Sequence, residues 1–200
     1  MLKKSQIPIL IVNILILLAF AILSVQRKSY EFMIYFAVVV FFFVLILATM
    51  KRTNFSNGIL WGLTLWAAMH MIGGLVEYRG GVIYGLVLVK LIENADLIVL
   101  RYDQLVHAIG FGVSTLVAFH LIKPYLNNKV NWTVLSVLVV LIGMGIGALN
   151  EIIEFITVVL LPQTGVGGYA NTMLDICFNT IGAIIAVIYI NIKRKVKNGK

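Results

Sequence analysis

Two pairs of ionisable side chains in otherwise apolar sequence are spaced to meet on a helix. Asp103 and His107 are four residues apart, and Glu151 and Glu154 are three apart. On a helix, residues at these spacings are neighbours on one face. Asn150 adds a carboxamide beside the second pair. Because charged groups within apolar helices are costly, both pairs are candidates for function.

Two further apolar segments carry polar groups at helical spacing. Asp175 and Asn179 are again four residues apart. His70 and Glu77 are seven apart, which is two helical turns or about 10 Å of rise. By helix rise, all these positions fall within roughly 15 Å of one membrane boundary.

Carboxylates and imidazoles together form a ligand set for a divalent metal, and also a set for general acid–base work or a proton relay. The candidate catalytic residues are Asp103, His107, Glu151, Glu154 and Asp175. The candidate binding residues are His70, Glu77, Asn150 and Asn179. The cofactor is left open: a divalent metal ion is the candidate, with the ligands His107, Glu151, Glu154 and Asp175. The sequence has no H-E-x-x-H motif and no phosphate-binding glycine loop, so it does not select one chemistry.

Several of these residues have a purely structural alternative. Asp103 and Asp175 stand near expected helix starts and could cap free backbone amides. Glu77 could only mark the water boundary, and His120 lies near the opposite end of its helix, where a structural role is expected. The Glu151/Glu154 pair has no evident packing purpose, which favours function.

The composition indicates a membrane protein. Of the 200 residues, 61% are hydrophobic and only 12% charged, far from the balance of a soluble domain. The net charge of +8 does not indicate nucleic-acid binding, because the basic residues flank apolar runs, as in membrane proteins. The single cysteine, Cys177, excludes an intrachain disulfide and is expected to be buried.

The apolar runs predict an all-α, polytopic bundle of six transmembrane helices, since about 20 residues cross a bilayer. The expected spans are Ile7–Val25, Phe32–Met50, Gly58–Tyr78, Asp103–Ile122, Asn131–Leu161 and Thr172–Ile192. Val82–Ile92 is apolar but too short to cross, which predicts a re-entrant or interfacial segment between the third and fourth helices. We expect one membrane domain over residues 1–200, with a two-helix buttress (1–56), a four-helix core (57–193) and a basic tail (194–200).

The basic residues predict the orientation. With the N-terminus inside, eleven of the sixteen lysines and arginines lie on the cytoplasmic side. By the positive-inside rule, both termini are cytoplasmic in a multi-pass protein of the plasma or inner membrane. The first span is expected to be an uncleaved anchor, although Ala19–Ala21 resembles a cleavage site.

The same threading brings all eight acidic residues to the outer half of the membrane or outside it. A carboxylate at mid-helix costs about 2.5–3.5 kcal/mol even on the lenient insertion scale. We therefore expect spans three to six to surround an outward-facing polar pocket, in which these groups face one another, water or a cation. The first two spans are expected to form a lipid-facing support.

At these residues the chain resembles two groups of bacterial membrane proteins. The stretch from Arg101 to Phe111 is similar to the R-x-x-Y-D-R-x-x-H-x-x-x-G-F stretch of YjdF-like proteins and to D-K-x-x-H-x-x-x-F of VanZ-like proteins. Glu151–Glu154 resembles the Y-E-x-x-E of the first group and the E-x-x-Q of the second. Asp175–Gly182 is most similar to D-x-x-x-N-x-x-G of VanZ-like proteins. His70, Gly73 and Gly74 resemble the third span of YjdF-like proteins.

The resemblance covers roughly residues 60–190 and has departures. Gln104 stands where both groups usually carry a basic residue, and Asn150 replaces the tyrosine before the first glutamate. The acidic run before the last aspartate is missing, and Gly168 and Asn171 occupy that region. The resemblance implies an integral membrane protein of the cell envelope with no settled activity; VanZ itself is linked to resistance against teicoplanin.

Three functions are compatible with the sequence. The first is an enzyme or binder that acts on an envelope lipid or lipid-linked head group from the outer leaflet. The second is a small proton- or ion-coupled transporter, for which the inner halves of the helices supply few polar groups. The third is a non-catalytic scaffold. The expected partners are the lipid bilayer and such a lipid substrate, without nucleic acid; whether the protein is an enzyme and its oligomeric state stay open.

Overall fold

The computed structural model describes residues 3–28, 30–94, 97–127, 129–162 and 164–198. Within them six long helices are each long and apolar enough to cross a membrane. They are α1 (Ile7–Arg27), α2 (Tyr30–Thr53), α3 (Asn57–Leu75), α4 (Tyr102–Ile122), α5 (Trp132–Leu160) and α6 (Tyr169–Asn198). Short 3-10 turns, η1 (Lys4–Gln6) and η3 (Lys123–Tyr125), precede α1 and follow α4. The predicted all-α bundle of six helices is confirmed.

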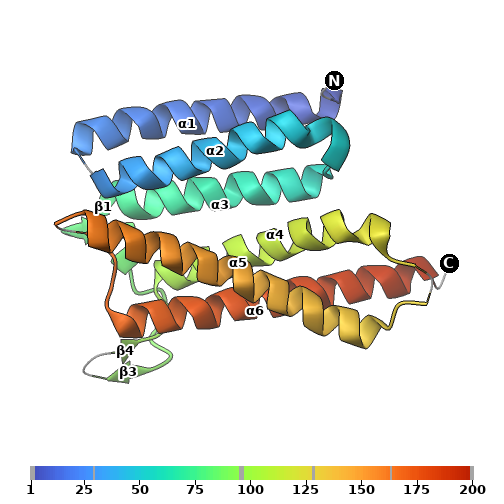
Figure 1. Cartoon of the computed structure of the whole chain (residues 1–200). Coiled ribbons are helices and arrows are strands. Elements are labelled where there is room, and N and C mark those ends of the chain that lie inside the picture. Colours follow the sequence, from blue (N-terminus) through green and yellow to red (C-terminus); the bar gives the residue numbers. More distant parts are fainter. Residues whose placement is uncertain (1–2, 29, 95–96, 128, 163, 199–200) are drawn as a thin grey trace.

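Figure 1 shows the helices running back and forth along one direction, with both termini at the same end. Helices α1, α2 and α3 pack together, α4, α5 and α6 pack together, and α3 contacts α4. The connection between α3 and α4 lies at the end opposite the termini, together with the start of α6 (Figure 1). We call this the distal end; the other is the terminal end.

The connection between α3 and α4 is built from short hairpins. Strands β1 (Glu77–Tyr78) and β2 (Gly81–Val82) pair, followed by the 3-10 turn η2 (Ile83–Gly85). Strands β3 (Glu93–Asn94) and β4 (Leu97–Ile98) pair antiparallel further along. The interfacial position of Val82–Ile92 stays a prediction. The side chain of Glu93 and all of Asp96 lie outside the described part of the chain.

The predicted extension of the third helix to Tyr78 is wrong. The helix ends at Leu75 because Val76 is extended, with φ −97° and ψ 126°. Gly80 has φ +84°, a conformation that side chains with a Cβ rarely adopt, and it turns the chain so that Tyr78 pairs with Gly81. Glu77 thus lies on a strand, so that its helical register with His70 does not exist.

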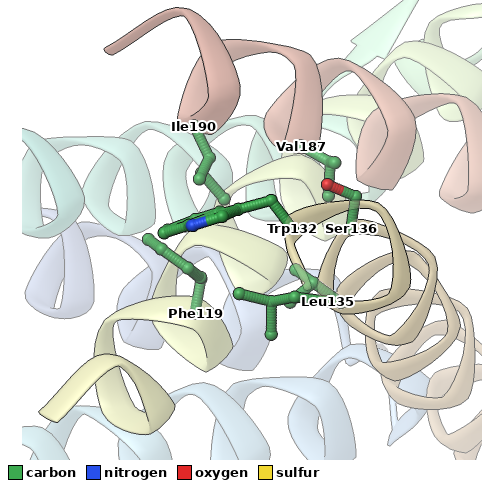
Figure 2. Close-up of a pocket in the computed structure, with 7 residues that line it drawn as sticks. Phe119, Trp132, Leu135, Ser136, Val187 and Ile190 are labelled. Carbon is green, nitrogen blue, oxygen red and sulfur yellow. The ribbon is translucent and has the colours of Figure 1, made fainter. Parts of the chain in front are cut away.

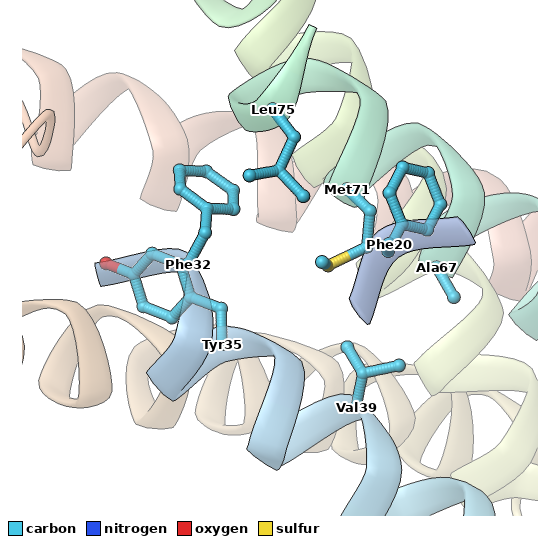
Figure 3. Close-up of a cluster of buried hydrophobic side chains, with 7 residues drawn as sticks. All are labelled: Phe20, Phe32, Tyr35, Val39, Ala67, Met71 and Leu75. Carbon is cyan, nitrogen blue, oxygen red and sulfur yellow. The ribbon is translucent and has the colours of Figure 1, made fainter. Parts of the chain in front are cut away.

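A buried apolar cluster joins the first three helices. Figure 3 shows side chains of α1, α2 and α3 that face one another. The cluster contains Phe20, Phe32, Tyr35, Val39, Ala67, Met71 and Leu75. In addition, the Asn13 amide donates to the Thr64 hydroxyl at 2.6 Å, which links α1 to α3.

Helices α4 and α6 approach each other through glycines. A Cβ added to Gly182 would lie 2.1 Å from the carbonyl oxygen of Ala108 and 2.9 Å from the amide nitrogen of Gly112. On α5, a Cβ at Gly147 would lie 2.8 Å from the side chain of Asn179. Small residues allow such backbone approach within membranes, and here they bring the polar segments of α4, α5 and α6 together.

The outer surface of the bundle is apolar, as expected for helices in contact with lipid. Leu15 and Leu18 of α1, Phe41 of α2 and Phe155 of α5 are all more than half exposed. Cys177 is exposed as well, so the expectation of a buried thiol is wrong. It lies two residues after Asp175, on a part of α6 that faces away from the helix contacts.

Candidate functional site: a carboxylate–histidine cluster beside a polar cavity

Four carboxylates from three helices surround the imidazole of His107 toward the distal end. The Nε2 atom of His107 lies 3.6 Å from Asp103 Oδ1, 3.9 Å from Glu154 Oε1 and 4.0 Å from Asp175 Oδ1. Its Nδ1 atom lies 3.5 Å from Glu151 Oε1. We call these five residues the carboxylate–histidine cluster; they are the five candidate catalytic residues of the sequence. Their roles in catalysis stay a prediction.

The start of α4 holds Asp103 and His107 in place. Gln104 is fully buried, and its Oε1 accepts hydrogen bonds from the backbone amides of Leu100 at 2.6 Å and Arg101 at 2.9 Å. A glutamine near a helix start thus satisfies amides that precede the first turn. Gln104 therefore caps the start of α4, and the side chain of Asp103 faces the cluster instead.

One face of α6 carries polar residues at every fourth position. Asn171 donates to Asp175 Oδ2 at 2.6 Å and to Asp103 Oδ2 at 3.3 Å, so it connects α6 to α4. Asn179 Oδ1 lies 3.0 Å from His107 Nδ1. Because a carboxamide oxygen only accepts, Nδ1 donates the proton of this bond, and Nε2 faces the carboxylates of Asp103, Glu154 and Asp175.

Helix α5 supplies two carboxylates with different environments. Asn150 donates to Glu154 Oε1 at 2.7 Å, an i,i+4 bond on one face of the helix. Glu151 is buried, and its Oε1 has no hydrogen-bond partner among the described residues. The same holds for Oδ1 of the fully buried Asp175. A buried oxygen without a hydrogen-bond partner lowers the stability of the folded protein. Two such oxygens in one cluster therefore need an explanation.

A cavity of about 200 Å³ borders the cluster. Its walls include Asp103, Glu154 and Asn171, and its rim contains exposed residues of the distal connections. The other lining residues are Glu31, Tyr35, His70, Val82, Tyr84, Gly85, Arg101, Gly165, Val166 and Gly167. The cavity therefore connects the buried cluster with the distal surface, and its lining is largely polar or charged.

His70 lies in the cavity wall within a group of aromatic rings. Its ring stacks on Trp66 with centroids 5.6 Å apart, and its Nδ1 lies 2.5 Å from the Tyr84 hydroxyl. Burial raises the pKa of the Tyr84 phenol well above 10, with a further contribution from the nearby Asp103 charge. The phenol therefore stays protonated and donates to His70.

A backbone contact and an arginine from the distal connections shape the cavity. The amide of Gly165, between α5 and α6, donates to Glu31 Oε2 of α2 at 2.6 Å. Arg101 lines the wall, and its buried Nε has no hydrogen-bond partner within the described ranges. A positive charge therefore stands beside a site otherwise edged by carboxylates.

The structure does not bring every candidate to the cluster. Glu77 is exposed and forms an ion pair with Arg27 at the end of α1, and it does not line the cavity. Asn150 and Asn179 contact cluster members, whereas His70 lies in the cavity wall. His120 bonds the Thr53 carbonyl oxygen at 2.7 Å near the terminal end, which satisfies the last turn of α2.

A second hollow lies between α4, α5 and α6 near the terminal end. It is lined by apolar side chains and Ser136 (Figure 2). Its volume is about 10 Å³, roughly the smallest space that holds one water molecule. This hollow is a packing gap, and it does not continue the polar cavity toward the terminal end.

Sequence reasoning missed Glu31, Tyr35, Tyr84, Arg101 and Asn171 as cavity residues. Asn171 had a signal, because it stands four residues before Asp175 and continues the same helix face. The others reach the cavity through tertiary contacts that no local spacing predicts. Helix α2, expected to be a support only, contributes Glu31 and Tyr35.

One protein family matches nearly the whole chain. Its description is "Predicted membrane protein (DUF2238)", and the match spans residues 8–195. The chain belongs to this family. No curated protein and no solved structure matches it. This DUF2238 member is thus a membrane protein with six candidate spans, and its family description names no activity.

Proposed function

We propose that this protein binds, and acts on, the polar head group of an envelope lipid or lipid-linked intermediate at the outer face of the cell membrane. The observation that carries the proposal is the shared wall between the cluster and the cavity. Asp103 and Glu154 belong to both, so a group held in the cavity lies against the buried carboxylates.

The size of the cavity suits a head group better than a whole lipid. Pockets for drug-sized ligands have volumes of about 300–1,000 Å³, above the 200 Å³ available here. A lipid could place its head group in the cavity while its acyl chains stay in the bilayer against the apolar exterior.

The charges of the lining suit a phosphate-containing head group. Arg101 offers a permanent positive charge and a planar set of donors, which is suited to phosphate oxygens. Glu31 and Glu154 offer acceptors for hydroxyl or amine groups of the same ligand. Asp103 and His107 stand close enough to the cavity to take part in proton transfer.

An envelope role is further supported by the resemblance to VanZ-like and YjdF-like proteins, which we propose as relatives within the broader group. The residues that carry the resemblance include all five members of the cluster and Asn179, which bonds His107. A short motif shared by chance has no reason to converge in this way.

A transporter is a weaker interpretation. It requires a polar path across the membrane, whereas the hollow near the terminal end has an apolar lining with one serine. Asn191 and Ser136 bond each other there at 2.9 Å, and neither faces the cluster. A flux above that of empty liposomes after reconstitution would nevertheless favour transport.

The proposal is tested by lipid retention in nanodiscs that contain phosphatidylglycerol, phosphatidylethanolamine and a polyprenyl phosphate. Native mass spectrometry of the released protein reports which lipid remains bound. We expect wild type to retain one lipid class selectively. The double variant Glu151→Gln/Glu154→Gln should retain at least tenfold less of that lipid, because the isosteric change removes both carboxylates.

Glu77→Gln is the matched control, since Glu77 is a carboxylate outside the cavity. It should retain lipid as wild type does. Equal retention by wild type and the double variant would contradict the proposal. Loss of folding in the double variant, with no selective lipid on wild type, would favour the scaffold interpretation instead.

A further inference from the structure

We infer that the carboxylate–histidine cluster is a binding site for one divalent transition-metal ion, with Asp103, His107 and Asp175 as ligands. The inference deepens the proposed function and rests on it for the role of the ion. Binding of the ion itself is tested without any activity.

The separations between the three ligand atoms leave room for a metal ion. Two ligand atoms that each lie about 2.0–2.2 Å from a tetrahedral zinc ion are roughly 3.3–3.6 Å apart. His107 Nε2 lies 3.6 Å from Asp103 Oδ1 and 4.0 Å from Asp175 Oδ1, and the three ligand atoms all lie within 4.8 Å of one another. These separations exceed a hydrogen bond but leave room for an ion.

The second argument is the set of carboxamides that surrounds these ligands. Asn179 accepts the Nδ1 proton of His107, which orients the ring so that Nε2 points to the centre. Asn171 bonds the outer oxygen of Asp175 and of Asp103, so both Oδ1 atoms turn inward. Each ligand is therefore oriented by a neutral partner, as is typical of metal sites.

The third argument is the unpaired oxygen of Asp175. The side chain is fully buried, and its Oδ1 has no hydrogen-bond partner among the residues described. This oxygen lies 4.0 Å from His107 Nε2, which is too far for a hydrogen bond. An ion between the two atoms would bind both and supply the partner that Oδ1 lacks.

The donor set restricts the kind of ion. An imidazole with carboxylates suits zinc, manganese or iron, whereas magnesium and calcium prefer oxygen ligands only. Glu154 Oε1 lies 3.9 Å from the same Nε2 and also lines the cavity, so it stands on the open side of the site. A phosphate oxygen in the cavity would approach the ion from that side.

The test uses the full-length protein in detergent, stripped with a chelator and then exposed to zinc or manganese. After removal of free metal, elemental analysis measures ions per chain, and thermal unfolding measures stabilisation. We expect close to one ion on wild type. The variants Asp175→Asn and His107→Gln should lose at least a hundredfold in affinity, and Asn179→Ala about 10–100-fold, the usual cost of losing an orienting partner.

Glu77→Gln is the control and should bind as wild type does. Wild type without bound metal, or binding by Asp175→Asn and His107→Gln as tight as that of wild type, would overturn the inference. If one of these variants does not fold, Asp103→Asn and Asn179→Ala provide the same comparison. Metal binding without lipid retention would refute the proposed function alone, and lipid retention by a protein that takes up no metal would refute the inference alone.

Discussion

At the scale of single residues, carboxamides determine the geometry of the site as much as the charged groups do. Gln104 satisfies the amides before α4, and Asn150, Asn171 and Asn179 each bond a member of the cluster. A neutral carboxamide orients an acid or imidazole without adding charge to a low-dielectric region. This explains how Gln104, a departure from the pattern of the resembling groups, is compatible with an intact site.

The bond between Tyr84 and His70 is the best single contact to test. Tyr84→Phe removes the donor and leaves the nitrogen of the half-buried His70 without its partner, so we expect a loss of about 1 kcal/mol in the free energy of unfolding. Because the pKa of Tyr84 is raised in the folded state, its contribution is fully present below pH 10 and is lost as the pH rises beyond that value. Reversible unfolding in mild detergent at several pH values measures both effects.

The control for that experiment is Tyr78→Phe. Tyr78 is 49% exposed on strand β1, and its stacking on Arg79 survives in phenylalanine. We expect no measurable change. A Tyr84→Phe variant as stable as wild type would show that the bond contributes nothing to the cavity wall.

At the scale of helices, the contact between α4 and α6 positions the cluster. Gly182→Ala would force a methyl group against the backbone of Ala108, and overpacking of this kind typically costs about 1–3 kcal/mol. Separation of the helices should also weaken the Asn171 and Asn179 bonds. Thermal unfolding and lipid retention should therefore decline together.

Gly145→Ala on α5 is the matched control, because an added Cβ there meets nothing within 4 Å. It should leave unfolding unchanged or raise the midpoint slightly, since alanine favours helix more than glycine does. If both glycine variants unfold alike, the close approach of α4 and α6 does not determine the site.

The helices could be predicted from the sequence because an apolar run of about twenty residues permits few other structures in a bilayer. Their ends were less predictable. The third helix ends at Leu75 rather than Tyr78 because Val76 is extended, and α6 continues through basic residues to Asn198 rather than ending at Ile192. Spacing along single helices identified the five cluster residues. Arg101 and Tyr84 could not be identified in this way, because their positions depend on how the hairpin connection between α3 and α4 folds back onto the helices.

At the scale of the whole molecule, charge is separated along the bundle. The start of α4, the end of α5 and the start of α6, which carry the cluster, lie toward the distal end, whereas the end of α2, with Lys51, and the end of α4, which Lys123 follows, lie toward the terminal end. By the positive-inside rule, we predict that both termini face the cytoplasm. A fluorescent reporter fused to the C-terminus should therefore be active, and an alkaline phosphatase fused after Gly80 should be active too. The reverse pattern would place the cavity on the inner face.

The most direct measurement of the central claim is crosslinking with a lipid that carries a photoreactive diazirine on its phosphate-containing head group. After irradiation in nanodiscs, peptide mass spectrometry locates the attachment sites. We expect the attachment sites to concentrate on the cavity rim at residues 82–85 and 165–167. In the double variant Glu151→Gln/Glu154→Gln, the yield of attachment at these residues should be at least tenfold lower. Attachment spread evenly over both ends of the bundle, and unchanged in the double variant, would contradict the claim.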